Sequence, residues 1–104
     1  EVICDNNLED KEIKMGCGCD LMSDVLRFIK PNSLLLTGLT HTQVIRTAEM
    51  ADINVICFVR GKRPNDETIA LAKKSGIALL ATNLPLFEAC GRLYKLGLPG
   101  CSEY

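Results

Sequence analysis

The segment Met-Gly-Cys-Gly-Cys-Asp at residues 15–20 places two thiols one residue apart, each beside a glycine. In an extended chain Cys17 and Cys19 point to the same face, so both sulfurs can reach one metal ion. A structural zinc or an iron–sulfur cluster usually takes four protein ligands, and no Cys-x-x-Cys or His-x-x-x-His completes the set. A symmetric dimer would supply the same pair from its second chain. The alternatives are close packing allowed by the glycines and a redox thiol pair.

A second group of residues suits an anion. Arg60, Lys62 and Arg63 surround Gly61 just before a predicted helix. Free N–H groups at a helix start, with cations beside them, favour a phosphate or nucleotide. The loop has neither the P-loop pattern nor Gly-x-Gly-x-x-Gly. The alternative is a solvated turn whose cations pair with the acids at positions 66 and 67.

The single histidine, His41, lies between Thr40 and Thr42. A general base needs a partner within hydrogen-bond reach, and no Gly-x-Ser-x-Gly or similar motif supplies one. We therefore expect a cap or a ligand contact here, and a protein that is not an enzyme. Of the other thiols, those at positions 4, 57 and 90 are predicted to be small buried side chains, and Cys101 to be exposed in a tail.

Alternating elements must position these groups. Strand-like apolar runs cover residues 33–38, 54–59 and 77–82, and helical patterns cover residues 40–51, 64–76 and 83–97. The helix starts are assigned to Thr40 or Thr42, Asn65 or Asp66, and Asn83. Upstream, residues 1–4 and 13–19 are predicted strands, and Asp20 is expected to cap a helix over residues 21–29.

This alternation predicts an α/β domain with a predominantly parallel sheet and helices on both faces. Loops beyond the carboxyl ends of parallel strands carry the functional groups in such sheets. Residues 39–42, 60–64 and 82–85 occupy these places, which adds Thr82 and Asn83 to the candidate ligand-binding residues.

Size and composition limit the function classes. The chain has 104 residues, 47% of them hydrophobic, and a net charge of −1, which fits one domain and argues against nucleic-acid binding. It has no apolar run long enough to span a membrane. We expect reduced thiols, a cytoplasmic protein, and a short native segment before Glu1.

Three segments, residues 20–26, 63–82 and 86–97, resemble the DRTGG domain family, and the resemblance covers residues 19–98. The chain is most similar to small stand-alone members found near iron-only hydrogenase genes. It is also similar to the N-terminal domain of HPr kinase/phosphorylase. The Asp-Arg of the family falls at residues 40–42, and its Thr-Gly-Gly falls near residues 59–62, where only Gly61 matches.

The resemblance implies a single α/β domain of regulatory type, dimeric and without its own catalysis, in hydrogenase or redox metabolism with a protein partner. Such a domain would sense a small ligand or partner through the strand-end loops. Two alternatives follow. One is a hydrogenase accessory protein with an iron–sulfur cluster or metal on Cys17 and Cys19 across a dimer. The other is a module that binds adenine nucleotides. The cofactor itself is not identified.

Overall fold

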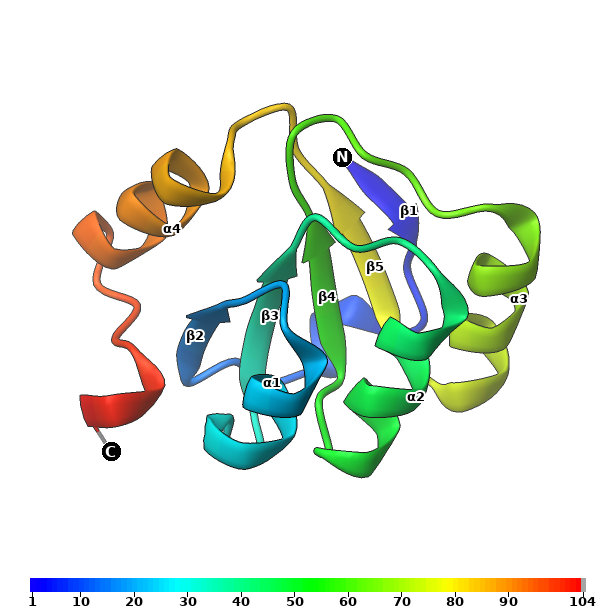
Figure 1. Ribbon diagram of the computed structural model, residues 1–104, viewed down its shortest axis with the longest axis horizontal. Coiled ribbons are helices and arrows are strands. Elements are labelled where there is room, and N and C mark those ends of the chain that lie inside the picture. Colours follow the sequence, from blue (N-terminus) through cyan, green and yellow to red (C-terminus); the bar gives the residue numbers. More distant parts are fainter. Residues whose placement is uncertain (104) are drawn as a thin grey trace.

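Strands and helices alternate along the chain from Met15 onward, as the sequence predicts. The computed structural model describes residues 1–103 (Figure 1). The strands are β1 (Val2–Cys4), β2 (Met15–Gly18), β3 (Ser33–Thr37), β4 (Val55–Phe58) and β5 (Ala78–Ala81). The helices are α1 (Met22–Phe28), α2 (Thr42–Met50), α3 (Asp66–Ser75) and α4 (Leu86–Lys95), with short 3-10 turns at Leu8–Asp10 and Cys101–Glu103. Within the described chain, no helix is both long and apolar enough to cross a membrane.

The five strands form one mixed sheet in the order β1-β5-β4-β3-β2. β2, β3, β4 and β5 are parallel, and β1 pairs antiparallel with β5 at one edge. Each parallel step passes through one helix, α1, α2 or α3. Because every crossover moves in the same direction along the sheet and crossovers share one hand, these three helices cover the same face. The predicted α/β class and its mostly parallel sheet are therefore confirmed.

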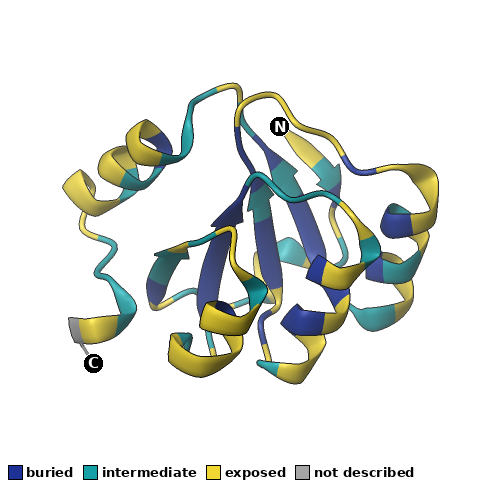
Figure 2. Ribbon diagram, in the orientation of Figure 1, coloured by how far each residue is buried: buried dark blue, intermediate teal, exposed yellow. Residues whose placement is uncertain are grey.

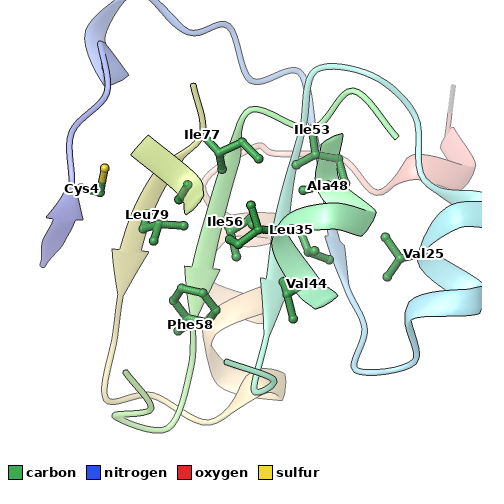
Figure 3. Packing of buried hydrophobic residues seen from close by; sticks show 12 residues of the cluster. Cys4, Val25, Leu35, Val44, Ala48, Ile53, Ile56, Phe58, Ile77 and Leu79 are labelled. Atoms are coloured by element: carbon green, nitrogen blue, oxygen red, sulfur yellow. The ribbon is translucent and has the colours of Figure 1, made fainter. Parts of the chain in front are cut away.

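The main core lies between the sheet and the three crossover helices. Side chains alternate between the faces of a strand, and Leu35, Ile56 and Leu79 point to this crossover face. There they meet Val44 and Ala48 of α2, as Figure 3 shows. All five side chains are fully buried. The near-continuous apolar runs of β3, β4 and β5 follow from burial on both faces of the sheet.

The other face of the sheet is covered by α4. Its Ala89 packs with Leu34 and Leu36 of β3, and with Val55 of β4. Figure 1 shows α4 on its own, away from α1, α2 and α3, and Figure 2 shows that much of α4 is exposed. Helices therefore cover both faces, with three helices on the crossover face and α4 alone on the other.

Three predicted helix starts are wrong. α1 begins after Leu21, because the Asp20 carboxylate is used by the neighbouring strand instead. The N-cap of α2 is His41, not Thr40 or Thr42, and it makes no side-chain capping bond. The N-cap of α4 is Pro85 and not Asn83. For Asp20, tertiary bonds to Thr37 and Gly38 replace the predicted capping bond.

The ends of α3 agree with the sequence. The side chain of Asn65 accepts a hydrogen bond from the Thr68 N–H at 2.9 Å, and Gly76 ends the helix with a φ of 76°. Asn6, far away in the sequence, donates from Nδ2 to the carbonyls of Ala72 at 3.0 Å and Ile77 at 3.1 Å. The chain after β1 therefore completes the carboxyl end of α3.

Candidate functional site

The carboxyl ends of the four parallel strands meet at one edge of the sheet. Residues 39–42 follow β3, residues 60–64 follow β4 and residues 82–85 follow β5. We name these segments the His41 loop, the Arg60 loop and the Thr82 loop. In Figure 1 all three leave the sheet at the end to which the arrowheads of β3, β4 and β5 point. The topology thus gathers the predicted loops at one edge.

Asp20 joins the ends of β2 and β3 at this edge. Its Oδ1 accepts a hydrogen bond from the Thr37 hydroxyl at 2.9 Å and another from the Gly38 N–H at 2.7 Å. Thr37 is fully buried and Asp20 is exposed. The sequence reasoning missed this role, although an acid just after one strand and a Thr-Gly pair at the end of the next are its visible signal.

The Arg60 loop and the Thr82 loop are bonded directly to each other. The Arg60 N–H donates to the Leu84 carbonyl and the Gly61 N–H donates to the Thr82 carbonyl, both at 2.9 Å. Arg60 and Gly61 have left-handed φ values of 59° and 68°, which turn the chain sharply after β4. A Cβ on Gly61 would lie 3.1 Å from Asn83 Oδ1. This position therefore favours glycine both for its left-handed φ and for the close approach of Asn83.

A cavity of about 230 Å³ lies beside the joined loops. It is lined by Glu1, Gly61, Arg63, Ala81, Thr82 and Asn83. Four of the nine predicted ligand-binding residues therefore share one cavity. Arg60 and Lys62 are exposed beside it in the same loop.

Arg63 holds a carboxylate at this cavity. Its two terminal nitrogens donate to the two carboxylate oxygens of Glu1, at 2.8 Å and 2.5 Å. This hydrogen-bonded, bidentate contact lowers the pKa of Glu1 and raises the pKa of Arg63. The sequence suggested Asp66 and Glu67 as partners of the loop cations, but the partner of Arg63 is Glu1. Both side chains are about half exposed, 52% for Arg63 and 59% for Glu1, so the pair adds little stability.

The His41 loop stands apart from this cavity. His41 is exposed, and Thr40 and Thr42 are half-buried at the start of α2. None of the three is among the residues that line the cavity beside Gly61 and Asn83. The structure therefore places these predicted residues at the same edge of the sheet, but it does not bring them into the same cavity.

Cys17 and Cys19 lie on one face of the sheet, as an extended chain requires. Cys17 pairs with Leu35, whose side chain is on the crossover face, and Cys19 packs against the same core. Cys101 is close by, with its sulfur 3.7 Å from the Gly16 carbonyl oxygen and 3.5 Å from Ser33 Oγ. Cys101 is therefore half-buried against β2, and the expectation that it is exposed in a tail is wrong.

The chemistry of these thiols does not suit a cluster held by one chain. Burial, with smaller contributions from the nearby Cys101 and Cys19 thiols, raises the pKa of Cys17 to about 12. A metal ligand must be a thiolate, whereas without a metal ion this environment favours the neutral thiol. Among residues 1–103, no three His, Cys, Asp or Glu side chains are grouped so that they can hold a metal ion. A cluster shared between two copies stays a prediction.

Comparison with known proteins adds no assignment. No protein-family model matches the chain, and no curated protein matches it. The resemblance to the DRTGG family therefore stays a prediction from the sequence.

Proposed function

We propose that this chain is a non-catalytic regulatory domain that binds a small anionic ligand at the Arg60 and Thr82 loops. The observation that carries the proposal is the cavity beside these two loops, where Arg63 already holds a carboxylate in a bidentate contact. The guanidinium fork has the geometry that carboxylate and phosphate groups require. An anionic ligand would take the place of the Glu1 carboxylate.

The Arg60 and Thr82 loops are held in a fixed conformation, which favours binding. The backbone bonds from Arg60 to Leu84 and from Gly61 to Thr82 hold both loops before any ligand arrives, so little ordering remains to be done on binding. Exposed Arg60 and Lys62 add positive charge beside the cavity, and Thr82 and Asn83 add polar groups in its wall. Because the Glu1–Arg63 pair is half exposed, replacing it costs little.

The wider assignment is part of the same proposal and rests on the resemblance alone. We place the chain in a homodimer of the DRTGG type, in the cytoplasm, with a protein partner in hydrogenase or redox metabolism. The exposed His41 of the His41 loop, on the same edge of the sheet, would extend the binding surface towards such a partner. A difference in ligand affinity between two states of the domain is sufficient for it to act as a switch.

The test is a binding panel of inorganic phosphate, AMP, ADP, ATP and a dicarboxylate, followed by calorimetry and thermal unfolding. A true ligand at 100 times its dissociation constant should stabilise the protein by about 2.7 kcal/mol. The double variant Arg60→Ala/Arg63→Ala removes the guanidinium fork and a neighbouring cation, and it should weaken binding at least tenfold. The control is Lys73→Ala/Lys74→Ala, which removes the same charge from the far end of α3.

Two results would contradict the proposal. One is the absence of saturable binding to any anion of the panel. The other is an equal loss of affinity in the two double variants, because that would mean that net charge, and not the loops, attracts the anion.

A further inference from the structure

A second cavity, of about 310 Å³, lies between α4 and the edge strand β2. It is separate from the strand-end loops and shares no lining residue with the cavity beside Arg63. Its wall holds no charged side chain, and consists of Gly16, Gly18, Leu36, Phe87, Cys90, Gly91, Leu93, Tyr94, Leu98, Pro99 and Gly100. The cavity is therefore a place for an uncharged, apolar group.

Two of the glycines in this wall are explained by packing within the chain. A Cβ on Gly18 would lie 2.5 Å from the sulfur of Cys90, and a Cβ on Gly16 would lie 3.0 Å from Leu98 Cδ2. Both side chains come from, or follow, α4. β2 can thus lie against α4 only because it carries no side chain on this face.

Gly91 and Gly100 have no such explanation. A Cβ at either position would meet nothing within 4 Å. Gly91 is also in the interior of α4, where glycine is among the least favourable residues for a helix. Glycine at position 91 therefore lowers the stability of α4 although packing within the chain does not require it. The missing side chain leaves open space above the cavity.

We propose that this cavity binds an uncharged molecule of the size of a bicyclic aromatic ring system. A closed apolar cavity of about 150 Å³ holds one benzene molecule. The cavity under α4 is partly open to solvent, and its volume of 310 Å³ has room for about two fused rings. Phe87 and Tyr94 stand two turns apart on α4 at the wall, where their rings can contact a flat ligand. The absence of charge in the wall favours a neutral molecule over an anion.

The probe is indole, with benzoate as the charged counterpart, titrated into ¹⁵N-labelled protein and followed by amide spectra. We expect saturable shifts at the amides of Gly16, Gly18, Gly91 and Gly100 with indole and none with benzoate. Gly91→Leu should fill the mouth of the cavity and weaken indole binding at least tenfold. Gly91→Ala is the matched control, because its methyl group meets nothing and leaves the affinity within about twofold.

The same spectra contain the outcomes that would overturn the proposal. One is indole binding that does not saturate, and another is equal affinity in Gly91→Leu and the native chain. A third is that a second copy of the chain fills the cavity through Phe87, which is 88% exposed beside it. If dilution alone shifts the four glycine amides, and Phe87→Ala removes both that effect and a dimer seen by sedimentation, then a second copy of the chain occupies the cavity instead.

Discussion

Replacing Asp20 with alanine should loosen the ends of β2 and β3. One oxygen of this carboxylate accepts from the Thr37 hydroxyl at 2.9 Å and from the Gly38 N–H at 2.7 Å. Hydrogen bonds to a charged group contribute about 1.5–3 kcal/mol each when no water replaces them. The Gly38 bond is exposed, so water can satisfy that N–H, but Thr37 is fully buried and its hydroxyl cannot be reached in the same way.

We therefore expect Asp20→Ala to lower the free energy of unfolding by about 2 kcal/mol, the value of the one bond that water does not replace. In a domain of this size, that corresponds to a fall in Tm of roughly 8 °C. Urea unfolding followed by circular dichroism measures the first quantity and calorimetry the second. Asp20→Asn keeps an acceptor oxygen and should lose less than about 1 kcal/mol.

The control is Asp24→Ala, which removes an exposed carboxylate from the first turn of α1 and should cost at most about 1 kcal/mol. A double-mutant cycle gives a further check, because Thr37→Val removes the donor and should reduce the cost of Asp20→Ala. If Asp20→Ala is no more harmful than Asp24→Ala, or if the cycle shows no coupling, the bond between the strand ends is not a source of stability.

Three further results are expected. Asn65→Ala removes the acceptor for the Thr68 N–H, and it should lower the free energy of unfolding, measured by urea unfolding, by about 1 kcal/mol. Asn65→Asp keeps an acceptor oxygen and should leave the free energy of unfolding close to that of the native chain. Asn6→Ala removes the side-chain donor to the carbonyls of Ala72 and Ile77, so amide exchange in the last turn of α3 should become faster while that of α2 is unchanged. Cys17, with its pKa raised to about 12, has a thiolate fraction on the order of one in 10⁴ at pH 8. Its alkylation by iodoacetamide, followed by mass spectrometry, should be at least a hundredfold slower than in the unfolded chain and should accelerate as pH rises; equal rates would contradict the effect of burial.

The two proposed sites differ in the ligands that they suit. The cavity at the strand-end loops has a guanidinium and polar side chains, and the cavity under α4 has no charged side chain. α4 begins immediately after the Thr82 loop, so one element touches both regions. Binding of phosphate and binding of indole can therefore be measured separately, and then together on the same sample.

The local sequence was sufficient to predict the strands, the helices and the α/β fold class. The apolar runs of β3, β4 and β5 are buried on both faces, and continuous apolar runs are what such burial requires. α3 could be assigned to its ends because Asn65 and Gly76 act on backbone groups only a few residues away. The order of strands and helices then placed the three predicted loops at one edge.

The partners of the loops were decided by tertiary structure. Asp20 looks like a helix cap when only its neighbours in the sequence are considered, but β3 lies beside it in the sheet and takes its carboxylate. Arg63 binds Glu1, which is 62 residues away in the sequence. Cys101 contacts Gly16 of β2, which is more than 80 residues away in the sequence. The open space beside Gly91 is equally invisible in the sequence. A pattern of residue types specifies which face of an element is buried, whereas contacts and cavities depend on which distant surfaces meet when the chain folds.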